Sequence, residues 1–324
     1  MNGTTPPRLS VIVPTYNRAP ILAHCLEALA AQDCGPEAFE VIVADDGSSD
    51  ETRATAERFA AKPAPRVRYI HQQNAGANRA RNRAIGIAHG PVLLLINDDT
   101  IATPRMVGEH LAMHERFADE RVAILGRVTV SPEIPRSRLA PLHLDYAFAS
   151  LGDRTELDWR AFFTCNVSVK KSLLERGELF EERVRYHEDL ELAERLSHHG
   201  LRVVYRPQAL GYHEHFLTEQ EFLAIARREA KALVEWSRIA PRLHSFLGEF
   251  GFEPAMPAAV RLKHRAADVV VNRATIPLWC WLARNVPGVL EGLALRIYGK
   301  VYQSERRAGL RDALRERRES ASTT

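Results

Sequence analysis

Cysteine is scarce in this sequence and shows no functional spacing. The four cysteines, Cys25, Cys34, Cys165 and Cys280, include no C-x-x-C pair and no spacing typical of metal ligands. This pattern argues against a disulfide framework and against a cysteine-based metal site. Buried, reduced thiols in a cytosolic protein are the prediction.

Long apolar runs are absent where they would indicate export or membrane insertion. Residues 1–8 contain no apolar signal region, so we expect residence in the cytoplasm. The apolar stretch from Ile276 to Tyr298 is interrupted by prolines and charged residues. It therefore lacks the roughly 20 clean residues that a helix needs to cross a bilayer.

Charge is nearly balanced in total, at +3, but it is unevenly distributed. Residues 1–260 carry 31 Lys and Arg against 35 Asp and Glu, a net −4, whereas residues 261–324 carry 13 against 6, a net +7. Two interpretations remain for the basic tail. It contacts an anionic surface, nucleic acid or membrane, or it is a solvated helical face.

The first part of the chain alternates short apolar runs with helical periodicity. With 45% hydrophobic residues among 324, the chain can bury a large core. The expected strands run from Leu9 to Val13, Phe39 to Ala44, Val67 to Gln72, Val92 to Ile96 and Val122 to Val130. Strand, loop and helix alternate, which predicts an α/β fold with a mostly parallel, Rossmann-like central sheet flanked by helices.

The fourth expected strand ends in two adjacent acids. The run from Val92 to Ile96 breaks off into Asn97-Asp98-Asp99. Parallel sheets bind ligands at the carboxyl ends of their strands, and hard oxygen ligands there suit Mg²⁺ or Mn²⁺. A plain turn is the alternative, because Asn and Asp are common turn formers.

Three other polar segments are expected at the same edge of the sheet. They are Pro14-Thr15-Tyr16-Asn17-Arg18, Asp45-Asp46 and Arg79-Ala80-Arg81-Asn82. Carboxylates can accept hydrogen bonds from a base or a ribose, and arginines can bind phosphates. Taken singly, each segment is explained by a turn, a helix cap or a solvated face. Their coincidence at one edge favours a ligand site.

Taken in order, these segments resemble the family 2 glycosyltransferases of GT-A fold. The resemblance rests on Val11 to Arg18, Val43 to Ser48, Asn74-Ala75-Gly76 with Ala80-Arg81-Asn82, and Asn97-Asp98-Asp99, and covers roughly residues 9–215. It implies a GT-A catalytic domain over residues 1–215. It also implies transfer of a sugar from a nucleotide-diphosphate donor to an acceptor hydroxyl, usually with inversion and with Mn²⁺ or Mg²⁺.

The resemblance further implies roles for single residues. Donor binding is expected from Pro14, Tyr16, Asn17, Arg18, Asp46, Arg81 and Asp98. Among these, Asp46 looks like the carboxylate that reads the nucleotide base, Arg81 like a phosphate contact, and Asp98 like a donor-sugar or ribose contact. Asp99 looks like the metal ligand. Asn97 stands where many members have the first acid of an Asp-x-Asp, which leaves the metal one carboxylate fewer.

A second group of acids lies in Tyr186-His187-Glu188-Asp189, at the expected start of a helix that ends at Gly200. Acids are common in a first helical turn because they interact favourably with the dipole. In the family pattern, however, this pair supplies the general base for the acceptor hydroxyl, which contributes about 10² to 10⁴ in rate. Asp189 is the predicted base, with Glu188 as alternate or orienting neighbour. His213 is the predicted further metal ligand, with His215 as the fallback.

Two further features concern the acceptor. The Q-x-x-R-W signature of processive polysaccharide synthases in this superfamily is absent after the predicted base, which favours a single addition in cell-envelope or polysaccharide glycan synthesis. Residues 131–160 are irregular. Long loops inside a compact domain are usually functional or mobile, so this one is the predicted acceptor loop.

The remainder of the chain, residues 216–324, is predicted to be helical. A capping box at Thr218-Glu219-Gln220-Glu221 starts a helix to about Arg238, and helices from Val260 to Arg273 and from Ile276 to Tyr298 follow. Tryptophans beside arginines predict an interfacial segment, peripheral on the inner face of the plasma membrane. Packing on the catalytic domain or in a homodimer is the alternative. We expect a glycan or lipid-linked acceptor and no nucleic-acid partner.

Two other functions compete with glycosyl transfer. A nucleotidyltransferase of similar fold would normally show a Gly-rich N-terminal loop, where this chain has Pro14 to Arg18. A non-catalytic scaffold that binds a sugar nucleotide or a membrane would not need Asp46, Asp99, Asp189 and His213 together. An enzyme is therefore the prediction.

Overall fold

The computed structural model describes residues 6–142, 148–241, 244–249 and 251–322, which form two compact units. The first unit contains the described residues up to Pro135 and those from Phe148 to His215. The second contains residues 136–142 and those from Phe216 onward. Of the predicted acceptor loop at 131–160, residues 136–142 thus belong to the second unit, and residues 143–147 lie outside the described part of the chain.

The first unit is built around one mixed β-sheet. Its strands are β1 (Leu9–Thr15), β2 (Phe39–Asp45), β3 (Arg66–His71), β4 (Val92–Ile96), β5 (Thr100–Ala102), β6 (Val122–Val130), β7 (Glu156–Leu157), β8 (Asn166–Lys170) and β9 (Arg202–His213). The order is β3-β2-β1-β4-β8-β6-β9-β5, with β7 beside β9. Strands β1 to β4 are parallel, whereas β8 is antiparallel to both β4 and β6.

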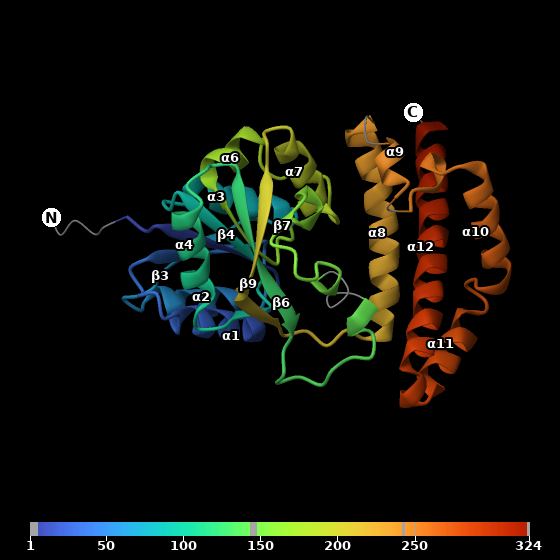
Figure 1. Ribbon diagram of the computed structural model, residues 1–324, viewed down its shortest axis with the longest axis horizontal. Helices are drawn as coiled ribbons and strands as arrows, with labels where there is room; N and C mark the ends of the chain where they lie inside the picture. Colours follow the sequence, from blue (N-terminus) through green and yellow to red (C-terminus); the bar gives the residue numbers. More distant parts are fainter. Residues whose placement is uncertain (1–5, 143–147, 242–243, 250, 323–324) are drawn as a thin grey trace. The chain divides into compact units, whose positions relative to one another are not determined.

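Helices cover both faces of this sheet (Figure 1). They are α1 (Ala19–Ala30), α2 (Thr52–Ala60), α3 (Ala77–Ile87), α4 (Met106–Arg116), α6 (Lys171–Arg176) and α7 (Glu188–Ser197). The arrangement confirms the predicted α/β class, because each of the first three parallel strands is followed by a helix that returns the chain to the edge where the next strand begins. The polar segments after β1, β2 and β4 therefore lie together at the opposite edge, where these strands have their carboxyl ends.

The core explains why the strands read as continuous apolar runs. Every residue of β1, β2 and β4 is buried, as expected for strands covered on both faces. Alternate residues such as Val11, Val41 and Leu94 join a hydrophobic cluster with α1, α2 and α4. Helix α3 packs against β1 and β2. The polar ends of these strands are thus held by a rigid, close-packed frame.

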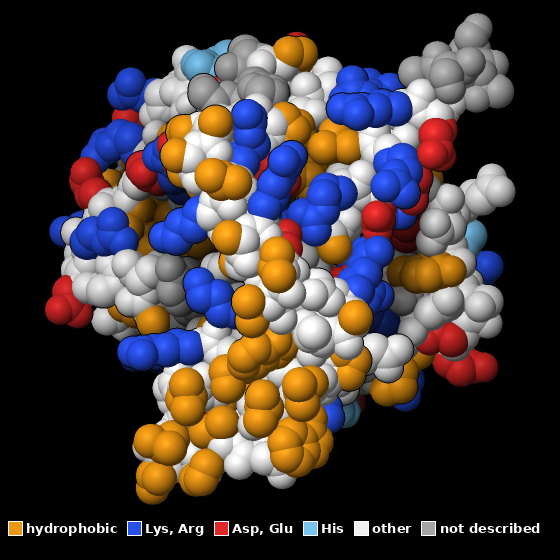
Figure 2. Space-filling view, turned by 90° about the vertical axis from the view of Figure 1, so that its right-hand side faces the viewer, with side chains coloured by type: hydrophobic (Ala, Val, Ile, Leu, Met, Phe, Trp, Pro, Cys, Tyr) orange, Lys and Arg blue, Asp and Glu red, His pale blue; other side chains and the backbone are white. Residues whose placement is uncertain are grey.

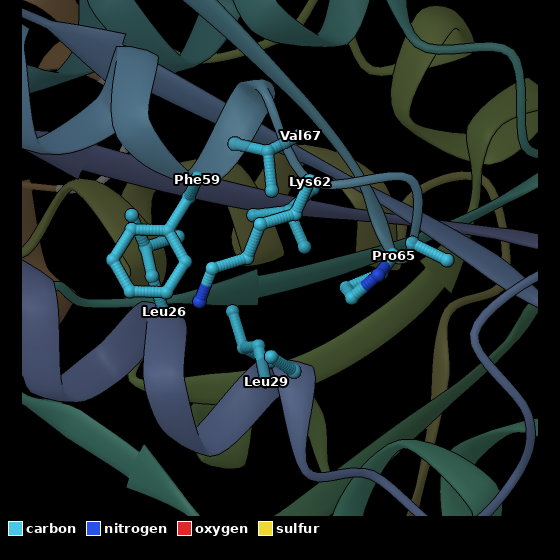
Figure 3. Close-up of a pocket in the computed structure, with 9 residues that line it drawn as sticks. Leu26, Leu29, Phe59, Lys62, Pro65 and Val67 are labelled. Carbon is cyan, nitrogen blue, oxygen red and sulfur yellow. The ribbon is translucent and has the colours of Figure 1, made fainter.

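Figure 3 shows a small hollow between α1, α2 and the start of β3. Its wall is mostly apolar, and the side chain of Lys62 extends across it, with Nζ 4.2 Å from the centre of the Phe59 ring. The hollow has no room for a water molecule. It is a gap in the packing of the helices on the sheet and not a ligand site.

Gly90 provides a stability prediction for this frame. A Cβ at residue 90 would lie 2.6 Å from the backbone carbon of Leu9 and from the backbone nitrogen of Ser10. Gly90→Ala should therefore push β4 away from β1 and lower the free energy of unfolding by about 2 kcal/mol or more. Gly86→Ala is the matched control, because a Cβ there meets nothing within 4 Å. It should leave stability unchanged or raise it by about 0.5–1 kcal/mol. Urea denaturation measures both; equal effects would contradict the argument.

The second unit is helical apart from its short connections. Its helices are α8 (Glu219–Ile239), α9 (His244–Leu247), α10 (Ala258–Val270), α11 (Ile276–Asn285) and α12 (Glu291–Ser322), with 3₁₀ turns η1 (Ala140–Leu142), η4 (Glu253–Ala255) and η5 (Gly288–Leu290). Helices α8 and α12 run side by side (Figure 1). The predicted capping box is confirmed: the Thr218 hydroxyl accepts from the Glu221 backbone N–H, and the Glu221 carboxylate accepts from that of Thr218.

One helix prediction in this unit was wrong. The stretch from Ile276 to Tyr298 is not a single helix, because α11 ends at Asn285 and α12 begins only at Glu291. Val286 adopts an extended backbone, as expected for a residue before a proline, and Pro287 directly precedes η5. Among the described helices of the chain, none combines the length and the apolar character that crossing a membrane requires.

Candidate active site

A cavity of about 500 Å³ opens at the carboxyl ends of β1, β2 and β4. Its wall consists of Pro14, Thr15, Tyr16, Arg18, Asp46, Asn74, Ala77, Arg81, Asn97, Asp98, Asp99 and Arg185. The structure thus brings together the residues predicted for donor binding, apart from Asn17, with the predicted metal ligand Asp99. The cavity is within the size range of small-molecule sites.

The two acids after β4 are held by the loop after β1. The Thr15 hydroxyl donates to Asp98 Oδ2 over 2.8 Å, and Arg18 Nη1 donates to Asp98 Oδ1 over the same distance. Arg18 Nη1 also lies 3.0 Å from Asp99 Oδ2. Burial raises the pKa of Asp98 to about 6, with Arg18 lowering it and Asp99 raising it. One arginine therefore stabilises two buried carboxylates whose mutual repulsion is otherwise unfavourable.

Asp99 and His213 meet because β5 pairs with β9. The pairing aligns Thr100 with His213 and places His213 Nε2 3.5 Å from Asp99 Oδ2. Burial alone would raise the pKa of Asp99, but His213 and Arg18 outweigh burial and hold this pKa well below its usual range. The ring of His215 lies 5.7 Å from that of His213, centre to centre.

The Asp99–His213 pair fits a divalent metal ion. Asp99 Oδ1 is buried and has no hydrogen-bond partner among the described residues, although a buried carboxylate oxygen normally has one. A carboxylate oxygen beside an imidazole is a donor set that Mn²⁺ accepts readily, whereas Mg²⁺ favours oxygen alone. Within the described part of the chain no three His, Cys, Asp or Glu side chains gather closely enough to hold a metal. Among the described residues two donors at most are therefore available, and phosphate oxygens and water would have to complete the shell.

Arg81 connects the cavity with the start of α7. Its Nη1 donates to Glu188 Oε1 over 3.0 Å, and its Nη2 donates to Asn97 Oδ1 over 3.1 Å. The side chain is almost completely buried, so both bonds are protected from water. Asn97, which replaces the first acid of an Asp-x-Asp, is thus an acceptor for Arg81. The Arg81 side chain thus bonds to Glu188 on α7 and also lines the cavity.

Asp189 lies in the first turn of α7. His187 precedes the helix with a left-handed backbone, φ 60°, and turns the chain into it. Burial and the neighbouring Glu188 raise the pKa of Asp189 to about 6, while His187, the Leu190 backbone N–H and Arg81 lower it. A carboxylate with this pKa is ionised at neutral pH and basic enough to accept a proton. Neither Asp189 nor Glu188 is among the residues that line the cavity; Glu188 reaches it through Arg81.

Asp46 is buried and holds the loop after β3. Its Oδ1 accepts from Gln72 Nε2 and the Ala75 backbone N–H, and its Oδ2 accepts from the Gly76 backbone N–H, over 2.7, 2.8 and 2.8 Å. Gly76 has φ 105°, which favours glycine at this position. Asp46 therefore fixes the loop after β3 and keeps acceptor capacity for a ligand. Its neighbour Asp45 accepts from Ser48 and Tyr69 instead.

The residues of the loop after β1 have two different roles: some line the cavity, and others hold the loop in place. Tyr16 is 47% exposed at the wall of the cavity, where an aromatic ring is available for contact. Asn17 does not line the cavity. It adopts φ 52°, accepts from the Ser49 backbone N–H and donates its own backbone N–H to Ser48. Asn17 thus positions the loop; its direct contact with a donor stays a prediction.

Sequence reasoning missed Arg185 and gave no role to Asn74. Arg185 lines the cavity, where its guanidinium packs over Gly76 and its Nη2 lies 3.4 Å from the Ala75 carbonyl oxygen. The cavity therefore has three arginines, Arg18, Arg81 and Arg185, from three distant parts of the chain. Arg185 stands three residues before the predicted acid pair, and this proximity was the available signal.

Comparison with known proteins identifies the family. The model of the family described as glycosyl transferase family 2 matches residues 10–176, a little over half of the chain. The chain belongs to this family. The predicted family and enzyme class are thereby confirmed, and the nucleotidyltransferase alternative is removed.

The curated relatives that this chain matches are distant in sequence. The validoxylamine A glucosyltransferase of Streptomyces hygroscopicus subsp. limoneus is 30% identical over 233 residues, which is 63% of this chain and 51% of the relative. This chain therefore spans about half of that relative's length.

Solved structures with the same fold extend over nearly the whole chain. The mannosyltransferase PcManGT from Pyrobaculum calidifontis, in complex with GDP-Man and Mn²⁺, superposes with a TM-score of 0.62 at 21% identity, over 93% of this chain and 86% of that chain. S. aureus TarS 1–349, in complex with UDP-GlcNAc, gives 0.55 at 18% identity, over 95% and 92%. At these identities the likeness establishes the fold, and the predicted GT-A fold is confirmed.

Proposed function

We propose that this enzyme transfers one sugar, with inversion, from a nucleotide-diphosphate sugar in the cavity to an acceptor hydroxyl near Asp189. The observation that carries the proposal is the convergence in one cavity of Asp46, three arginines and Asp99, whose carboxylate lies beside His213 and has one unpartnered oxygen. The named ligands of the structural neighbours, GDP-Man and UDP-GlcNAc, are of the same chemical class. Which nucleotide and which sugar this chain takes is set by the shape of the cavity.

Each residue has a chemical role in this proposal. Asp46 accepts from the nucleotide base, and Asp98 accepts from the ribose or the donor sugar. Arg81 and Arg185 donate to the diphosphate, which suits the geometry of guanidinium groups. Asp99 and His213 hold Mn²⁺ or Mg²⁺. A bound ion there would offset the negative charge of the diphosphate and of the leaving group.

The transfer itself is a single displacement. The acceptor oxygen forms a bond to the anomeric carbon from one side, while the bond from that carbon to the diphosphate oxygen breaks on the other. Asp189 takes the hydroxyl proton, and the electron pair leaves with the nucleoside diphosphate. Arg81 contributes at both ends, because its guanidinium lines the cavity and also holds Glu188 beside the base. Inversion follows from the single step.

The acceptor in this proposal is a glycan or a lipid-linked glycan. The relatives include a succinoglycan biosynthesis protein, ExoU of Rhizobium meliloti (strain 1021), 28% identical over 199 residues. We further propose that the enzyme acts in the cytoplasm, with its helical unit on the inner face of the plasma membrane. A homodimer through that unit is the competing arrangement.

A thermal-shift screen tests the proposal. One nucleotide-diphosphate sugar with Mn²⁺ should raise the Tm, because a ligand that binds only the folded state stabilises it by mass action. Arg185→Ala should weaken binding of that donor by about tenfold to a hundredfold, since hydrogen bonds to charged groups are worth about 1.5–3 kcal/mol. Arg183→Ala is the matched control, because Arg183 pairs with Glu181 and does not line the cavity. If no nucleotide sugar shifts the Tm, donor binding in the cavity is contradicted, and a scaffold that binds only a membrane becomes the better interpretation.

A further inference from the structure

Helix α10 is amphipathic, but its apolar side faces outward. Ala259, Leu262, Ala266 and Val269 recur at helical spacing and are all exposed, with Leu262 at 69% and Val269 at 77%. No residue of α10 is buried. A helix on the surface of a globular protein normally turns such a stripe towards the core.

The polar side of α10 makes its contacts with the rest of the unit. Asp268 accepts from Arg307 and, over 2.9 Å, from Arg311, both on α12. His264 lies 4.0 Å from Glu253. The two ion pairs of Asp268 orient the helix, so the outward direction of Leu262 and Val269 is built into the fold.

The segment after α10 adds larger exposed apolar side chains to the surface of the unit. Leu278 and Trp281 on α11 are 56% and 53% exposed, and Val289 and Leu290 on η5 are 93% and 52% exposed. In Figure 1, α10 and α11 lie beside α12 within the second unit, and Figure 2 is turned so that this side of the unit faces the viewer. Hydrophobic side chains gather at its lower end and continue upward between Lys and Arg side chains. We call this surface the docking face; it contains Leu262, Val269, Leu278, Trp281, Val289 and Leu290.

The docking face is surrounded by cations that have no acidic partner. Residues 258–300 contain seven Lys and Arg against two acids, a net +5. Within the described chain, Arg273 and Arg284 pair with acids, whereas Arg261, Lys263, Arg265, Arg296 and Lys300 do not. Exposed apolar side chains next to unpaired cations match the two components of an anionic lipid surface, acyl chains and phosphates.

We propose that the docking face binds the surface of an anionic bilayer, with α10 and α11 lying in the plane of the interface. Trp281 and its apolar neighbours enter the boundary between headgroups and acyl chains, as tryptophan prefers. Lys263, Arg265 and Lys300 then contact lipid phosphates. A two-fold contact with a second copy would instead press the same cations against one another, and such like-charge contacts are costly. Binding of the docking face to a bilayer does not depend on the transfer reaction. Only the further statement, that this binding brings the enzyme to a lipid-linked acceptor, rests on the proposed function.

Flotation of the full chain with vesicles tests the docking. We expect it to float with phosphatidylcholine vesicles that contain phosphatidylglycerol, to stay behind with pure phosphatidylcholine, and to be released by high salt. Lys263→Glu with Lys300→Glu should lower the partition coefficient at least about tenfold, and so should Leu262→Ser with Val269→Ser. Arg58→Glu with Arg66→Glu makes the same charge change on exposed residues of the first unit and should have no comparable effect.

Two further measurements keep the outcome decisive. Fluorescence emission from Trp281 should shift to shorter wavelength on anionic vesicles and be quenched by brominated lipid. Trp281→Phe should remove the shift and the quenching that come from this residue, whereas Trp159→Phe should keep them. Thermal unfolding and nucleotide binding should match the parent in every variant, which separates loss of docking from loss of fold or of the donor site. Equal binding to neutral and anionic vesicles would overturn the proposal. So would a dimer in light scattering that Trp281→Glu converts to monomer.

Discussion

Asp189→Asn should lower kcat by on the order of 10² or more while donor affinity stays within about threefold of the parent. Asparagine has the size of aspartate and can hydrogen bond, but it cannot take the proton of the acceptor hydroxyl. Asp189 is not among the residues that line the cavity, so the contacts with the donor should remain in the variant. Calorimetry with the donor and initial rates of transfer separate the two effects.

Glu188→Gln is the comparison that identifies the base. This change keeps a side chain that can accept from Arg81 but removes a charge that raises the pKa of Asp189. We therefore expect a smaller loss of kcat than for Asp189→Asn. If Asp189→Asn keeps most of the activity and Glu188→Gln does not, Glu188 is the base and the assignment made here is wrong.

The pH profile gives a second readout of the same prediction. The pKa of Asp189 is raised to about 6, and the groups around it are Glu188 and His187 at the start of α7, Arg81 on α3 and the buried thiol of Cys165. Only the ionised carboxylate accepts a proton, so kcat/KM should rise with pH through about 6 and level off above it. Glu188→Gln should move this limb to lower pH, and Asp189→Asn should abolish it.

The parallel half of the fold could be predicted because its strands carry an unambiguous pattern. The run from Val92 to Ile96 is apolar at every position, and β4 is buried at every position. Turn residues follow it at once, so the end of the strand and the location of Asp98 and Asp99 were predictable together. The same reasoning holds for β1 and β2, whose loops contribute Arg18 and Asp46.

The antiparallel half could not be predicted in this way. Strand β8 is inserted between β4 and β6, and its register with β4 is a long-range pairing that a local pattern does not encode. The pairing of β5 with β9, which brings His213 to Asp99, is of the same kind. The resemblance to the family predicted a metal-binding role for His213. The pairing of β5 with β9 gives the physical reason why His213 lies beside Asp99.

Helix α10 illustrates a further limit of sequence patterns. Its periodicity states which residues share a side, and Leu262 and Val269 do share one. It does not state whether that side faces the core or the solvent. Here ion pairs between Asp268 and the arginines of α12 decide the direction, and these form between residues about 40 positions apart.

The second large effect concerns the metal. Mn²⁺ should increase the affinity of the parent for a nucleoside diphosphate. Asp99→Asn should reduce this increase in affinity by a factor on the order of 10². The amide keeps the shape of the side chain but supplies a weaker, uncharged ligand in place of the unpartnered Oδ1. Arg18 retains its bond with Asp98, so the variant should remain folded. Titration calorimetry with and without Mn²⁺ measures the effect without any turnover.

The two histidines after β9 provide the matched controls. His213→Ala should lose most of the Mn²⁺ enhancement, because His213 Nε2 lies 3.5 Å from Asp99 Oδ2. His215→Ala should keep it. The reverse result would transfer the ligand role to His215, and equal enhancement in Asp99→Asn and the parent would remove Asp99 from the metal site. Because calorimetry reports binding alone, a failure here would leave the assignment of Asp189 as base untouched.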